Sequence, residues 1–195
     1  MQPLIRNAGR VLVCCIVVTT GTLSHSQAST SKPAAGTQMT PAGTYGKLLG
    51  ILEKEFVDAV EAMPEDKFNF APPEGSGDFK GVRTFAGQVK HVTGSSYYFF
   101  GGPSMTQDAV KAKEDSVEKL TSKADIVQAL KDSLTNAHAF IDGITAENAY
   151  VTMSNGGTRA GMASFGIAHM MDHYGQLVVY LRMNGIVPPA SRGSM

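Results

Sequence analysis

The sequence has 195 residues, of which 17 are basic and 17 acidic, so its formal net charge at pH 7 is zero. The basic residues are scattered and form no stripe, which argues against a nucleic-acid-binding protein. Once two N-terminal segments are set aside, about 150 residues remain, which is the length of one domain and enough for a substantial hydrophobic core.

Residues 1–28 have the features of a signal peptide. Arg6 and Arg10 form a positive start, an apolar run follows over residues 11–23, and small residues end the segment at Ala28. The apolar run is too short for a comfortable membrane span. We therefore expect cleavage after Ala28, export to the periplasm or the medium, and no stable membrane insertion afterwards. A retained N-terminal anchor is the alternative.

Cleavage would remove both cysteines, because Cys14 and Cys15 are the only two in the sequence. The mature protein would then have no disulfide and no thiol to act as nucleophile or metal ligand. Histidine is the remaining candidate for binding a soft metal. Loss of Arg6 and Arg10 would also leave 15 of the 17 basic residues against 17 acidic residues, a formal net charge of −2.

Residues 29–42 are small, polar and proline-bearing, which is typical of a flexible linker. Apolar residues at three- and four-residue steps then predict a first helix over residues 43–62, which Pro64 ends. The following segment, residues 65–81, contains two prolines and three glycines and is expected to be a long ordered loop. Three phenylalanines are available to hold this loop against the core: Phe68, Phe70 and Phe79.

A second helix is predicted over residues 84–100, capped by the side chain of Thr84 and ended by a Gly-Gly-Pro sequence. Residues 104–120 are mostly charged and polar, so we expect a solvated connection there, with no more than a turn of helix. Apolar stripes predict a third helix over residues 123–143 and a fourth over residues 159–184.

No stretch shows sustained alternation with a period of two. The predicted fold class is therefore all-α, an antiparallel four-helix bundle with two long crossing connections. The folded domain is expected to span residues 43–190, with residues 191–195 as a C-terminal tail.

Two histidines of the predicted fourth helix, His169 and His173, are the most informative feature. Residues four apart share one helix face, so both imidazoles can bind a single metal ion. His91 on the predicted second helix can complete a three-nitrogen site across the core. Gly87 and Gly94 flank His91, and each costs about 1 kcal/mol relative to alanine in a helix. Close helix approach or an open pocket beside His91 would explain them.

The alternative is that these histidines are structural and hydrogen-bond backbone carbonyls or Asp172. That interpretation suits any one of them alone. Three helical histidines with compatible faces favour a metal site that leaves positions open for water or substrate. His138 lies at the edge of an apolar stripe and is expected to be a boundary residue, and His25 falls within the signal peptide.

The most specific stretch is His169-x-x-x-His173-x-Gly-Gln-Leu, followed by the ending Tyr180-Leu-Arg-Met-Asn-Gly-Ile-Val-Pro-Pro. These residues closely resemble the DinB-like (YfiT-like) family of metalloenzymes. Three earlier segments share the resemblance, in the same order: Met63-Pro-Glu-Asp-Lys-Phe, Ala71-Pro-Pro-Glu-Gly and Gln88-Val-Lys-His-Val-Thr-Gly-Ser-Ser-Tyr-Tyr-Phe. The resemblance covers residues 43–190.

The resemblance implies a four-helix bundle in which one histidine of the second helix and two of the fourth hold a divalent metal. His91, His169 and His173 fall on these positions. It also implies a homodimer, and some related proteins transfer or use low-molecular-weight thiols in a metal-dependent way. The expected export sets this protein apart from the cytoplasmic thiol transferases among those relatives.

The expected function is that of a metal-dependent hydrolase or thiol transferase acting on a small molecule. Zinc is the expected metal, with nickel or iron as alternatives, because imidazole nitrogens suit all three. Asp172 is the candidate catalytic residue, and candidates for substrate contact are Tyr98, Tyr174 and Gln176. A non-catalytic metal- or ligand-binding protein is the main alternative, and a purely structural homodimer is another.

Overall fold

The computed structural model describes residues 32–103 and 105–193. The chain divides into two units, Met1–Thr37 and Gln38–Met195. In the first unit the described residues form a turn, in which the amide of Thr37 donates to the carbonyl of Ala34 over 3.1 Å. The predicted signal peptide, residues 1–28, lies outside the described residues.

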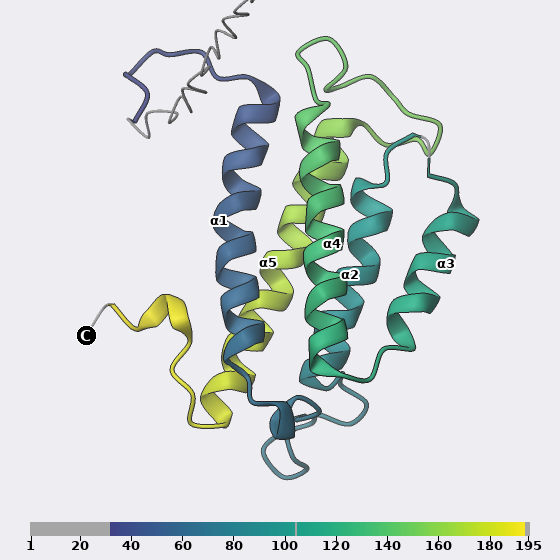
Figure 1. Ribbon diagram of the computed structural model, residues 1–195. Helices are drawn as coiled ribbons and strands as arrows, with labels where there is room; N and C mark the ends of the chain where they lie inside the picture. Colours follow the sequence, from purple (N-terminus) through teal and green to yellow (C-terminus); the bar gives the residue numbers. More distant parts are fainter. Residues whose placement is uncertain (1–31, 104, 194–195) are drawn as a thin grey trace, which may run out of the picture. The chain divides into compact units, whose positions relative to one another are not determined.

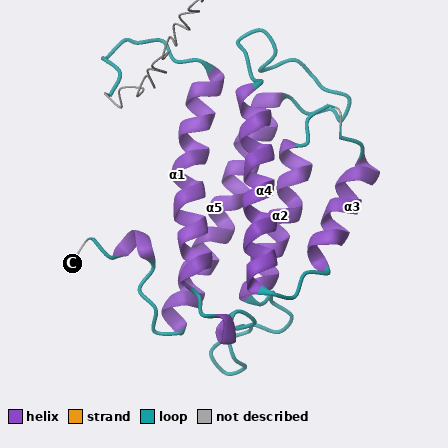
Figure 2. Ribbon diagram, in the orientation of Figure 1, coloured by secondary structure: helices purple, strands orange, loops and turns teal. Residues whose placement is uncertain are grey.

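The second unit is helical (Figure 2). Its α-helices are α1 (Pro41–Ala62), α2 (Phe85–Phe100), α3 (Gln107–Glu118), α4 (Lys123–Asp142) and α5 (Arg159–Met183). A short 3-10 helix, η1 (Glu65–Lys67), lies between α1 and α2, and a second, η2 (Pro189–Ser191), follows α5. Within the described part of the chain there is no strand, only an isolated bridge between Thr152 and Thr158. The all-α prediction is therefore confirmed. No described helix has both the length and the apolarity to cross a membrane.

Each α-helix begins directly after a hydroxyl residue. In every case that side chain accepts a hydrogen bond from the amide three residues later; the capping residues are Thr40, Thr84, Thr106, Ser122 and Thr158. Such caps satisfy amides that have no partner within the helix. α1 begins at Pro41, two residues before the predicted start, because proline suits the first helical position.

The four long helices pack side by side, as Figure 1 shows. α1 contacts α4 and α5, and α2 contacts α4 and α5 as well as α3. The apolar stripes predicted from the sequence meet between these helices. The largest fully buried side chains are Phe56, Phe85, Leu49, Leu52, Met63, Ile126, Leu130, Leu134, Ile141, Ile144, Leu177 and Leu181.

The prediction of a solvated connection over residues 104–120 was wrong, because this segment contains α3. α3 buries a single side chain, Val117, and consists mostly of charged and polar residues, so it lacks the broad apolar stripe from which the other helices were predicted. It is stabilised by its N-terminal cap and by an ion pair one turn apart, Lys111 Nζ to Asp115 Oδ1 at 2.9 Å. α3 packs against α2 at Gly94, where an added Cβ would lie 3.4 Å from the Cα of Glu114.

The loop between η1 and α2 is ordered by two of the three predicted phenylalanines. The Phe68 ring is buried 5.4 Å from that of Phe85, and the Phe70 ring lies edge-on to Tyr180 at 5.7 Å. Phe79 is 37% exposed and contributes less than predicted. The carbonyls of Phe70 and Phe68 each accept a 2.8 Å hydrogen bond from an amide in the first turn of α2, so the loop ties down the start of that helix.

Candidate metal centre

The structure brings the three predicted histidines together where α2 packs against α5. His91 lies in α2, and His169 and His173 lie one turn apart in α5. One ring nitrogen from each falls within 4.8 Å of the other two. The Nε2 atoms of His91 and His169 are 3.2 Å apart, and the His173 ring centroid is 4.9 Å from that of His91. Within residues 32–103 and 105–193 this is the one group of three or more side chains arranged to hold a metal ion.

A glycine that the sequence analysis did not single out lets α5 approach α2 at this level. Gly166 lies one turn before His169, and an added Cβ would stand 2.5 Å from Cζ of Phe100 and 2.9 Å from Cβ of Phe99. Any side chain would therefore force the helices apart. Close packing at Gly166 is the reason that histidines from two helices can converge.

Burial lowers the pKa of all three imidazoles below the ordinary value of 6.5. For His173, burial and the neighbouring charges of His169 and His91 lower the pKa to about 4. The positive charge of Arg83 acts in the same direction on the pKa of each ring, whereas Asp172 raises the pKa of the two α5 histidines. The imidazoles are thus neutral at pH 7, which is the form that binds metals.

His173 is oriented by a network of three side-chain hydrogen bonds. Its Nδ1 donates to Oε1 of Gln88 over 2.7 Å, and Nε2 of Gln88 donates to Oε1 of Gln176 over 2.6 Å. Nε2 of Gln176 in turn donates to Oδ2 of Asp172 over 3.2 Å. Because Nδ1 of His173 carries the proton, its Nε2 keeps a free lone pair.

The sequence matches the model of a known protein family. The family model described as the DinB superfamily matches residues 49–177, a range that begins in α1, ends in α5 and contains all three histidines. The chain belongs to the DinB superfamily. No curated protein matches the sequence.

In this DinB superfamily chain, aromatic rings border the histidines on one side. Phe99 lies 5.2 Å from the His169 ring and also contacts Phe165 and Tyr98, at 5.3 and 5.2 Å between centroids. Phe99 is buried, but Phe165 is 64% and Tyr98 53% exposed. The site therefore opens beside an accessible aromatic surface.

The expected explanation of the glycines beside His91 is confirmed for Gly94 but not for Gly87. Gly94 allows the close approach of α3, and a pocket of about 290 Å³ lies between α2 and α3 with His91, Ser95 and Glu114 among its lining residues. Gly87 instead leaves room for the stem of Arg83, whose Cβ would lie 3.3 Å from an added methyl group. Both a close approach and a pocket are present.

The other residues predicted for the site lie in three separate places around the histidines. Asp172 and Gln176 belong to the hydrogen-bond network, and Tyr98 to the aromatic surface. Tyr174 lies toward α1, where burial and the charges of Glu55 and Asp58 raise the pKa of its phenol. Sequence reasoning missed the role of Gln88, although a glutamine in a predicted apolar helix, three residues before a candidate ligand, was a usable signal; the structure shows that this side chain is buried.

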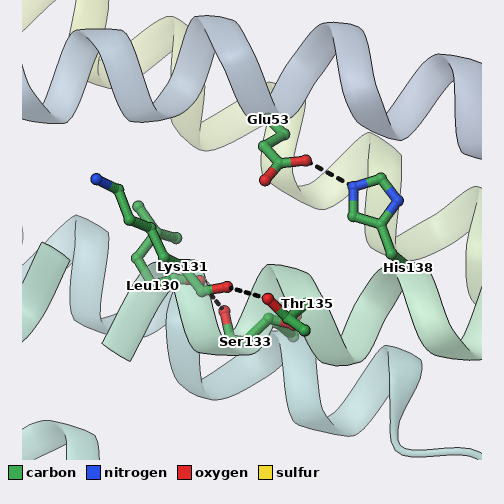
Figure 3. Close-up of polar contacts among 7 residues, drawn as sticks. Glu53, Leu130, Lys131, Ser133, Thr135 and His138 are labelled. Carbon is green, nitrogen blue, oxygen red and sulfur yellow. Dashed lines mark hydrogen bonds and ion pairs between the residues drawn. The ribbon is translucent and has the colours of Figure 1, made fainter. Parts of the chain in front are cut away.

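His138 lies apart from the three histidines. Its Nε2 is 2.6 Å from Oε2 of Glu53, so it joins α4 to α1 (Figure 3). The same view shows Ser133 and Thr135 hydrogen-bonded to carbonyls of their own helix. His138 is half-buried, in keeping with the boundary position expected for it.

Proposed function

We propose that this protein is an exported, metal-dependent hydrolase or thiol transferase acting on a small molecule. His91, His169 and His173 are the ligands of its divalent ion. The observation that carries the proposal is the convergence of three neutral imidazoles within 4.8 Å, in a DinB superfamily chain. The proposal takes α1, α2, α4 and α5 as the antiparallel four-helix bundle expected from the sequence, with α3 as an addition to it.

The donor set fits a divalent transition metal. Three imidazole nitrogens suit zinc, nickel and iron, and zinc is the proposed ion. When bound, such an ion supplies Lewis acidity, which lowers the pKa of a nucleophile such as water or a thiol. Three neutral protein ligands leave the full positive charge of the ion uncompensated, which strengthens this effect.

The residues around the ligands have distinct proposed roles. Arg83, close enough to lower the pKa of all three imidazoles, favours a negatively charged group in the site. The surface formed by Tyr98, Phe99 and Phe165 is suited to the apolar part of a substrate and to excluding water from one side.

A non-catalytic metal-binding role is the second candidate. It is favoured by one observation: the candidate base, Asp172, is already engaged by Gln176. The protein would then hold its ion or ligand without turnover.

The metal is tested by elemental analysis of protein purified without a metal-affinity column. We expect about one ion per chain in the parent and little in the His91→Ala, His169→Ala and His173→Ala variants. His138→Ala is the matched control, because it removes a half-buried, hydrogen-bonded histidine outside the group, and it should keep the ion. Equal metal content in all four variants would contradict the proposal.

Catalysis is tested with two probes, hydrolysis of 4-nitrophenyl acetate and transfer of a thiol to 1-chloro-2,4-dinitrobenzene. Turnover that a chelator abolishes and zinc restores supports an enzyme. Metal binding without turnover of either probe favours the second candidate.

Export and self-association are part of the proposal. Mass spectrometry of protein recovered from the periplasm or medium should show Ser29 at the N-terminus. Size-exclusion chromatography with light scattering should give the mass of a homodimer. Protein retained in the cytoplasm and beginning at Met1 would contradict export, and a monomeric mass would contradict the dimer.

A further inference from the structure

The network of Asp172, Gln176, Gln88 and His173 connects the protein surface to a buried ring. Asp172 is exposed and Gln176 half-buried, whereas Gln88 is 3% and His173 7% exposed. The network passes from α5 to α2 and back, since Asp172, Gln176 and His173 belong to α5 and Gln88 to α2. Each hydrogen bond has an N–O distance between 2.6 and 3.2 Å.

The chemistry of the four groups gives this network a direction. An ionised carboxylate only accepts hydrogen bonds, whereas each glutamine presents one accepting and one donating end. With Asp172 accepting, Gln176 must turn its NH₂ group outward and its oxygen toward Gln88. Gln88 must then donate to Gln176 and turn its own oxygen toward His173.

His173 can satisfy that oxygen only by carrying its proton on Nδ1. Turning either amide around would set oxygen against oxygen or NH₂ against NH₂, at a site where water cannot easily substitute because Gln88 and His173 are buried. The one member that cannot be turned around is the carboxylate. The direction of the whole network is therefore determined by Asp172.

We propose that Asp172 is a positioning residue that acts through Gln176 and Gln88 to hold His173 in the tautomer with Nε2 free for the metal. The inference rests on the proposed function, because it assigns the network a purpose at the three-histidine site. It differs from the sequence-based expectation that Asp172 is itself catalytic. Hydrogen-bond partners of ligating histidines commonly set ring orientation and tautomer in this way.

The tautomer is measured directly in the metal-free full chain. Nitrogen-15 correlation spectra of histidine-labelled protein at pH 8 distinguish Nδ1–H from Nε2–H rings, and His173→Ala identifies the signals of that ring. We expect the Nδ1–H form for His173 in the parent. In Asp172→Asn the new amide can donate as well as accept, so the direction is lost and both tautomers should appear.

The matched control is Asp132→Asn. Asp132 accepts a 2.8 Å hydrogen bond from Nε2 of Gln128 four residues earlier on α4, which is the same amide–carboxylate pairing without a histidine. This variant should leave the His173 tautomer unchanged. Zinc affinity, measured by competition with a chelator, should fall about tenfold or more in Asp172→Asn but not in the control.

A second substitution tests whether Asp172 acts through the direction of the hydrogen bonds or only through side-chain packing. Gln88→Glu places a carboxylate beside His173, which then accepts from Nδ1 without help from Asp172. In the Gln88→Glu background Asp172→Asn should therefore no longer affect the tautomer or zinc affinity. Circular dichroism and melting temperature verify that each variant folds, and Gln176→Leu interrupts the network at an independent point.

An Nε2–H tautomer of His173 in the parent would overturn the inference. So would an Asp172→Asn variant that matches Asp132→Asn in both tautomer and zinc affinity. A parent that binds no zinc overturns the proposed function and, with it, the role of Asp172 in metal binding. Intact zinc binding with an unchanged tautomer in Asp172→Asn overturns this inference alone.

Discussion

Replacing Gly166 by alanine should push α5 away from α2 next to the three histidines. The added methyl carbon would stand 2.5 Å from Cζ of Phe100 and 2.9 Å from Cβ of Phe99. Carbon atoms in contact normally lie about 3.5–4.0 Å apart, so a displacement of roughly 1 Å is required. Phe100 is buried against Phe140, and Cβ of Phe99 moves only with its backbone, so neither can yield freely.

Two opposing contributions determine how much Gly166→Ala changes the free energy of unfolding. Overpacking a core by a methyl group costs about 1–3 kcal/mol, whereas alanine stabilises a helix interior by about 1 kcal/mol relative to glycine. Gly175→Ala on the same helix is the control, because Gly175 is exposed and an added methyl there meets nothing within 4 Å. The helix-propensity terms cancel between the two variants. Gly166→Ala should therefore be less stable than Gly175→Ala by about 1–3 kcal/mol.

Urea denaturation in the presence of a chelator measures this difference, and zinc titration measures its consequence for the site. Because metal ligands must be held within about 0.5 Å of their geometry, a displacement at Gly166 should weaken zinc binding about tenfold. Equal stability and equal zinc affinity in the two variants would refute the argument that Gly166 sets the distance between the helices.

Lys123→Met should lower the free energy of unfolding by about 1–3 kcal/mol without changing zinc affinity. The reason is that Nζ of Lys123 donates hydrogen bonds to the carbonyls of Glu61 and Met63 at the end of α1, over 2.9 and 2.6 Å. Urea denaturation of the variant measures this loss. In metal-free protein the fold should lose up to about 3 kcal/mol between pH 6.5 and 4. Burial lowers the pKa of His173 from 6.5 to about 4, so the unfolded state binds more protons in that interval and is favoured as the pH falls. Denaturation midpoints that stay constant between pH 6.5 and 4 would contradict the predicted loss of stability at low pH.

Local sequence determined the four long helices and half of the site. Apolar residues at helical spacing and hydroxyl caps such as Thr84 act within one or two turns, so α1, α2, α4 and α5 were predictable to within two residues at each described end. The common face of His169 and His173 follows from helix geometry alone, because residues four apart lie one above the other.

Contacts between helices determined the rest. α3 contributes a single buried side chain, so its place depends on packing against Gly94 of α2, which no pattern within residues 104–120 records. The position of His91 relative to the α5 pair depends on the close approach at Gly166. The bond between Gln88 and Gln176 joins side chains 88 positions apart. Distances of this kind are set by how helix surfaces fit together, and helical periodicity specifies only which face each residue presents.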